Sequence, residues 1–149
     1  MRKVILLICL LLCLSFSIPV YASTENFKHQ IESMMSKVSE LSYEMETLTT
    51  DLHNKNLNTV YYELTLNINE TVDLYNSALS TMPTDTKEQI YYGYILKLIT
   101  FLEIGERISR DAVYYTMIGD TQSANKCTYT MVEVVNISSG LLSGLKSVE

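Results

Sequence analysis

The sequence is poor in the residues that bind metals and carry out acid–base chemistry, because it contains only two histidines, His29 and His53. A di-iron site in a helical bundle needs Glu-x-x-His motifs, and neither histidine follows a glutamate by three positions. The sequence also lacks a Cys-x-x-Cys-His haem motif, a Gly-x-Ser-x-Gly hydrolase motif and a glycine-rich phosphate loop. These absences argue against an enzyme, and we expect no catalytic residue, no metal and no cofactor.

Cysteine is equally scarce. Cys9 and Cys13 lie in an apolar N-terminal run, and only Cys127 follows it. One cysteine cannot form an intrachain disulfide, so the core alone must hold a small domain together. This favours a well-packed helical fold, in which a cysteine on a helical seam behaves as a small hydrophobic residue. We therefore expect Cys127 to be a core residue.

Residues 1–22 have the pattern of a signal peptide. The pattern consists of the basic pair Arg2 and Lys3, the apolar run 4–18, Pro19, and the small-x-small cleavage tripeptide Val20-Tyr21-Ala22. We expect cleavage after Ala22. A retained N-terminal anchor is the alternative, because the stretch of residues 4–22 is nearly long enough to span a bilayer. The protein is therefore expected to be extracytoplasmic, secreted or periplasmic, with one folded domain at residues 23–149.

Basic residues are few beyond the signal peptide. All 17 acidic residues follow it, against nine of the 11 lysines and arginines, which leaves a net charge of −8. An acidic chain without a basic stripe is repelled by phosphates and by anionic lipids. We therefore expect no nucleic-acid partner.

The clearest periodic signal lies in residues 27–52. Apolar side chains recur there at alternating spacings of four and three, as in a coiled coil: Phe27, Ile31, Met34, Val38, Leu41, Met45, Leu48 and Leu52. This heptad-like seam predicts a long amphipathic helix. The polar stretch of residues 53–56 predicts its end.

Three further helices are indicated by their ends. A second apolar seam starts at Leu57 and stops before Pro83, which cannot continue a helix. Asp85 begins a capping box for a third helix, and Gly119 provides a left-handed end to it. Asp120 or Thr121 then caps a fourth helix, whose seam runs from residue 124 to residue 148. Short turns place neighbours antiparallel, so we predict an all-α fold: an antiparallel up-down-up-down four-helix bundle.

The third helix carries two apolar stripes on opposite sides of a helical wheel. We assign the stripe from Ile90 through Leu98 to Tyr115 to the bundle interior. The opposite stripe begins with Tyr92, Leu96 and Ile99 and becomes charged further along the helix. Lys97 and the charged continuation argue against a membrane span, so we expect no stable span in the mature chain.

We predict that Tyr92, Leu96 and Ile99 point outward and bind a partner, because an exposed apolar patch on a soluble protein usually marks an interaction surface. Tyr62 and Leu66 form a similar outward pair on the second helix. Two alternatives stay open for the first three residues: cover by an irregular loop, or a small apolar ligand site. The expected function is protein–protein interaction or self-association in a homo-oligomer, without enzymatic activity. The alternative function is a small-ligand-binding or signal-sensing helical bundle.

Charged residues dominate the second half of the same outer stripe. Glu103 and Glu106 lie close to Arg107 and Arg110 in the helical spacing. Oppositely charged side chains at such spacings form ion pairs on exposed helix faces. We therefore interpret this cluster as a salt-bridged face in contact with solvent.

Overall fold

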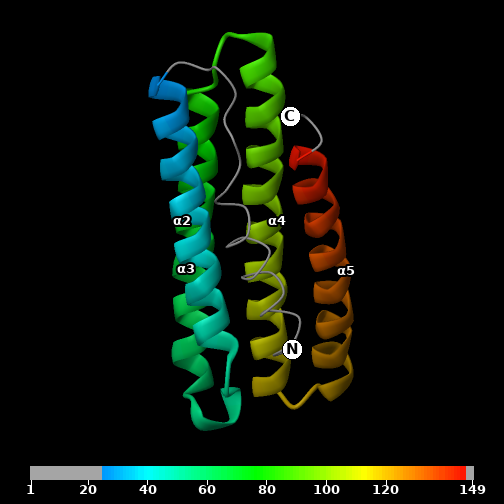
Figure 1. Ribbon diagram of the computed structural model, residues 1–149. Coiled ribbons are helices and arrows are strands. Elements are labelled where there is room, and N and C mark those ends of the chain that lie inside the picture. Colours follow the sequence, from blue (N-terminus) through cyan, green and yellow to red (C-terminus); the bar gives the residue numbers. More distant parts are fainter. Residues whose placement is uncertain (1–24, 147–149) are drawn as a thin grey trace.

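The computed structural model describes residues 25–146. In this range it has four α-helices, α2 (Glu25–Thr49), α3 (Leu57–Ser80), α4 (Thr86–Met117) and α5 (Thr121–Lys146), and a short 3-10 turn, η2 (Leu52–Asn54) (Figure 1). No strand occurs among the described residues. The predicted all-α class with four helices is confirmed. The predicted signal peptide, residues 1–22, lies outside the described residues.

Short polar segments determine where the helices begin and end. Asp85 accepts two backbone N–H bonds from the first turn of α4, at 2.9 and 3.1 Å. Gly119 follows α4 with a φ of 76°, and the next residue, Asp120, accepts a bond from the backbone N–H of Ser123 at 3.0 Å. Asn56 caps α3 in the same way, at 3.0 and 3.3 Å. The predicted boundaries at Asp85, Gly119 and Asp120 are thus confirmed.

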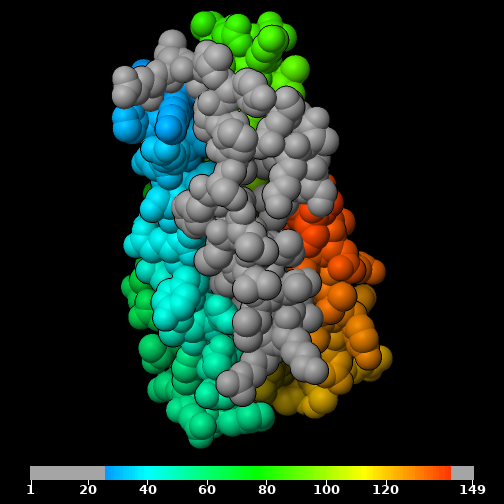
Figure 2. Space-filling model, viewed as in Figure 1, coloured from blue at the N-terminus to red at the C-terminus, as the bar shows by residue number. Residues whose placement is uncertain are grey.

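The four helices do not contribute equally to the packing. Helix α4 packs against α2, α3 and α5, and α2 also packs against α3. Within the described residues, α5 packs extensively on α4 alone. Figures 1 and 2 accordingly show α2 and α5 along opposite sides of the molecule. Helix α4 is therefore the element that joins α5 to the rest of the bundle.

The predicted seam of α2 forms the centre of the core. Its side chains from Phe27 to Met45 are buried, and Leu48 and Leu52 are half-buried against them. They pack with Leu64 of α3 and with the apolar side chains of α4. A helix with one buried stripe exposes the rest, as the charged outer positions of α2 do. The heptad prediction for this helix is confirmed.

The buried face of α4 differs from the predicted one. Tyr92 and Ile99 are fully buried and Leu96 is 8% exposed, whereas Ile90 of the expected inner stripe is 52% exposed. At 100° per residue, the buried side chains cover more than half of the helix circumference. A helix surrounded by three neighbours has no single inner stripe. The predicted outward direction of Tyr92, Leu96 and Ile99 is therefore wrong.

Gly105 of α4 lies where α2 and α5 both come close to this helix. A Cβ atom at this position would meet the sulfur atoms of Met45 and Met131, each at 3.8 Å. Such distances are ordinary van der Waals contacts, so a methyl group fits without displacing either methionine. Gly105 therefore lies on the buried side of α4, facing both neighbours.

Among the described residues, the apolar character of α4 does not extend to a membrane-spanning segment: no helix there is both long and apolar enough to cross a bilayer.

The buried position of Ile99 leads to a stability prediction. Ile99→Ala should lower the free energy of unfolding by about 2–5 kcal/mol, because it removes core contacts and leaves a cavity. Ile90→Ala is the matched control on the same helix and should change it by less than about 1 kcal/mol, since Ile90 is largely exposed. Urea denaturation of both variants measures the difference. Equal losses would contradict the position assigned to Ile99.

Two glycines should respond to alanine with opposite signs. Gly105→Ala should raise the free energy of unfolding by up to about 1 kcal/mol, because alanine favours the helix interior and the Cβ atom fits. Gly119→Ala should lower it by about 1–2 kcal/mol, because its φ of 76° is unfavourable for any residue with a side chain. Thermal unfolding of the two variants compares them. A destabilised Gly105→Ala protein would mean that the helices approach more closely there.

Candidate functional site

The five predicted partner-binding residues do not form one surface. Tyr62 and Leu66 of α3 are 60% and 38% exposed, as expected for an outward pair. Tyr92, Leu96 and Ile99 are in the core. Only the α3 pair is therefore accessible to a partner in this structure.

Tyr92 has a structural role that its hydrogen bonds make clear. Its hydroxyl donates to the carbonyl of Ala78 at 2.9 Å, accepts from Nε2 of Gln30 at 3.1 Å, and lies 2.9 Å from Oγ1 of Thr81. Its ring packs against Phe27, with ring centroids 6.3 Å apart. These contacts connect α2, the C-terminal end of α3 and α4. A buried tyrosine with a fully satisfied hydroxyl stabilises the fold and offers nothing to a partner.

A surface groove lies beside the exposed α3 pair. We call it the α2/α3 groove, and its lining residues are Tyr43, Glu44, Thr47 and Leu48 of α2 and Glu63, Leu66, Asn67 and Glu70 of α3. One residue of the predicted surface, Leu66, belongs to it. Tyr43, on the α2 side, is 66% exposed. The groove thus has an aromatic and an aliphatic side chain accessible to solvent.

The groove is acidic. Its three charged lining residues are all glutamates: Glu44, Glu63 and Glu70. Lys37 lies nearby and binds Glu70 across the two helices at 3.0 Å. This hydrogen bond with Glu70 is the main reason that the pKa of Lys37 is raised above its ordinary value. Glu44 and Glu63 remain without such a partner in the described residues.

Asn67 forms the most deeply buried part of the groove. It is 6% exposed, and its Nδ2 atom has no hydrogen-bond partner among the described residues. An amide N–H group that is buried without an acceptor destabilises a protein by roughly 1–3 kcal/mol. The groove therefore combines accessible apolar side chains, unpaired carboxylates and a donor in need of an acceptor.

A second polar feature lies inside the bundle. Glu106 of α4 is fully buried, and its Oε1 atom accepts a hydrogen bond from Oγ1 of the equally buried Thr71 at 3.0 Å. Its other oxygen, Oε2, has no hydrogen-bond partner within residues 25–146. Burial raises the pKa of Glu106 to about 8, although the bond from Thr71 opposes this shift. At neutral pH the carboxyl group is therefore mostly protonated.

The solvent-exposed, salt-bridged face predicted for this part of α4 is only partly correct. Glu103 and Arg107 do form an ion pair at 2.7 Å. Glu106 is instead in the interior, and Arg110 stacks over the ring of Tyr61, with its guanidinium carbon 5.7 Å from the ring centre. The reason is again the wide buried arc of α4, which includes the position two turns after Ile99.

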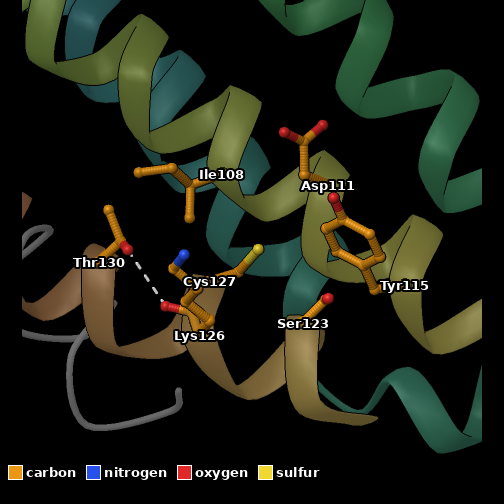
Figure 3. Close-up of a pocket in the computed structure, with 7 residues that line it drawn as sticks. All are labelled: Ile108, Asp111, Tyr115, Ser123, Lys126, Cys127 and Thr130. Atoms are coloured by element: carbon orange, nitrogen blue, oxygen red, sulfur yellow. Dashed lines mark hydrogen bonds between the residues drawn. The ribbon is translucent and has the colours of Figure 1, made fainter. Parts of the chain in front are cut away.

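A hollow between α4 and α5 contains the predicted core cysteine (Figure 3). It is lined by Ile108, Asp111, Tyr115, Ser123, Lys126, Cys127 and Thr130. Cys127 is only half-buried, so it lies at the edge of the α4–α5 contact. Desolvation by burial is the main reason that the pKa of its thiol is raised, and the charge of Asp111 adds to it. A raised pKa leaves less thiolate, so this thiol is not activated as a nucleophile.

In the part of the chain that the structure describes, no group of three or more histidine, cysteine, aspartate or glutamate side chains is arranged to hold a metal ion. Comparison of the chain with known protein families, with curated proteins and with solved structures gave no match.

The sequence prediction missed most of the groove and the buried acid. Asn67 and Thr71 are one helical turn apart on the inner side of α3, where apolar residues are expected. Polar residues at inner positions are a signal that could have pointed to this region. Tyr43 and Glu44 gave no such signal, because they occupy ordinary outer positions of the α2 heptads.

Glu106 should make the stability of the fold depend on pH. Its pKa is about 8 in the folded protein against an ordinary value of 4.5, so between these values only the folded state keeps the proton. The free energy of unfolding should then fall as pH rises, by at most about 1.4 kcal/mol per pH unit. Glu106→Gln removes this titration. Its free energy of unfolding should therefore rise relative to that of the parent protein between pH 5 and pH 8.

The measurement is urea denaturation at pH 5, 6.5 and 8. Glu133→Gln serves as the control, because it removes an exposed carboxylate from α5. This control should follow the pH dependence of the parent protein. Parallel stability curves for the parent and Glu106→Gln would show that Glu106 is ionised in the fold.

Proposed function

We propose that this protein is a non-enzymatic helical bundle that acts by contact with another protein through the outer face of α2 and α3. We call this surface the α2/α3 face, and it consists of the α2/α3 groove and Tyr62. The observation that carries the proposal is the exposure of Tyr43 and Leu66 in one groove, together with that of Tyr62, which lies one helical turn before Leu66 on α3.

The chemistry of these side chains supports a contact surface. A tyrosine has a large apolar ring and a polar tip, so it is tolerated in water and buries well against a partner. Tyrosine is accordingly enriched in protein interfaces. Leu66 adds an aliphatic side chain beside the groove, and exposed apolar surface with a polar rim is typical of interaction sites.

The same proposal includes export and topology. The basic and apolar pattern of residues 1–22 supports a signal peptide and an extracytoplasmic location. The short connections at residues 50–56, 81–85 and 118–120 support an up-down-up-down arrangement of the four helices, which agrees with the order of colours in Figure 1. A long bundle of this kind presents its helix faces side by side to a partner.

A small-ligand-binding bundle is the second function expected from the sequence. Sites for small molecules usually enclose most of the ligand. The α2/α3 groove is instead bordered by side chains that are themselves largely exposed, among them Tyr43 and Leu66. This geometry favours a protein partner, which covers the groove and its surroundings together.

Site-specific photo-crosslinking tests the proposed contact. A photoreactive phenylalanine analogue replaces Tyr62 in the full-length protein, which is then irradiated in its own cellular compartment. We expect a crosslinked adduct, with this protein or with a partner identified by mass spectrometry. Leu66→Gln, which removes the apolar side chain without adding charge, should reduce the adduct by about tenfold or more, the effect of losing roughly 1.4 kcal/mol of binding free energy.

Tyr129 of α5 offers a matched control position, because it is 75% exposed and lies outside the α2/α3 face. The same analogue at position 129 should form no adduct that depends on Leu66. Circular dichroism should show that Leu66→Gln keeps its helix content. Equal adducts from positions 62 and 129, or adducts unaffected by Leu66→Gln, would rule out this face as the contact.

A further inference from the structure

We propose that the α2/α3 groove receives a lysine or arginine side chain from a basic segment of the partner protein. The inference rests on the proposed function, because it specifies the chemistry of the partner at the same face. It follows from three independent properties of the lining residues: their charge, their apolar walls and one unsatisfied amide group.

The charge of the groove selects a cation. Glu44 and Glu63 come from different helices, line the same groove and are both half-buried. Neither forms an ion pair within the described residues, whereas Glu70 is already paired with Lys37. No lysine or arginine is among the lining residues. A guest ammonium or guanidinium group would therefore enter a site of uncompensated negative charge, where bonds between charged groups are stronger than between neutral ones.

The walls of the groove suit the stem of such a side chain. Leu48 and Leu66 supply aliphatic surface, and Tyr43 supplies an exposed ring. Lysine and arginine bury their methylene groups against apolar surface while their charged ends reach polar partners. A cation over a tyrosine ring is attracted to its face as well. A small inorganic cation would leave these walls unused.

Asn67 distinguishes a peptide from a free amine. Its side chain lines the groove and is more than nine-tenths buried, and its Nδ2 atom finds no acceptor in the part of the chain that the structure describes. A lysine or arginine side chain has no acceptor of its own. The backbone carbonyl groups of a bound peptide do, and one of them would satisfy the amide. The groove thus matches a basic side chain together with the backbone that carries it.

The same charges argue against the other classes of partner. In a symmetric dimer through this face, the groove carboxylates would approach identical carboxylates of the second copy. Like charges placed opposite each other across an interface destabilise the complex. Nucleic acids and anionic membranes are repelled for the same reason. A basic segment of a different protein is the occupant that the charge complementarity supports.

Two synthetic peptides serve as probes: an amphipathic peptide of leucine and lysine, and the same peptide with glutamate in place of lysine. Binding is followed by two-dimensional NMR of the isotope-labelled protein, with the side-chain amide of Asn67 and the backbone amide of Leu66 as reporters. The lysine peptide should shift both signals. The glutamate peptide should leave them unchanged.

Two double variants separate groove binding from general attraction to an acidic protein. Glu44→Gln with Glu63→Gln should weaken binding of the lysine peptide by about tenfold or more, because it removes both unpaired groove carboxylates. Glu88→Gln with Glu133→Gln removes the same charge outside the groove. This control should weaken binding by no more than about twofold, the size expected for screened charges at a distance.

Several results would overturn the proposal. They are shifts confined to residues outside the groove, equal weakening by both double variants, and equal binding of the glutamate peptide. In each case an adduct at position 62 that depends on Leu66 would leave the contact surface itself in place. If that adduct is absent although the groove binds the lysine peptide, the proposed function is refuted instead. The two failures are therefore distinguishable.

Discussion

The packing of α4 against α2, α3 and α5 is the interaction on which the rest of the structure depends, because α5 has no other extensive contact within the described residues. Removing the apolar surface of α4 would separate α5 from the α2–α3 pair. The same packing explains why the buried side chains of this helix extend beyond a single stripe and cover more than half of its circumference. Ile95, Ile99 and Val113 are all fully buried. A surface helix would need only one such stripe.

Two of the polar side chains that α4 buries, Tyr92 and Glu106, differ in how completely they are satisfied. The hydroxyl of Tyr92 has three hydrogen-bond partners from α2 and the end of α3. Among the described residues, one oxygen of Glu106 accepts a hydrogen bond from Thr71, and the other oxygen has no partner. A buried carboxyl group in this state favours the proton over the negative charge. Tyr92 therefore specifies how the helices meet, whereas Glu106 makes their association sensitive to pH.

The central position of α4 also decides which surfaces are accessible. The side chains that the helical wheel assigns to an outer stripe of α4 are buried by packing. The accessible apolar groups of the predicted site are those of α3. Asn67 and Thr71 lie one turn apart on that helix, the first in the groove and the second against Glu106. The groove and the buried carboxyl group are therefore separated by a single turn of α3. The groove differs from an ordinary gap between helices in its acidity and in its unsatisfied amide.

The sequence by itself determined the features that depend on neighbours along the chain. The seam of α2, the cap at Asp85 and the left-handed Gly119 could be predicted, because spacing and backbone preference act within a few residues. Only the tertiary structure decided the direction of Tyr92, Leu96 and Ile99, the burial of Glu106 and the existence of the groove. Helical periodicity tells which residues share a face. When apolar residues lie on opposite sides of a helix, the periodicity does not tell which side meets a neighbour. A groove made by Glu44 and Glu63 requires two helices to be brought side by side.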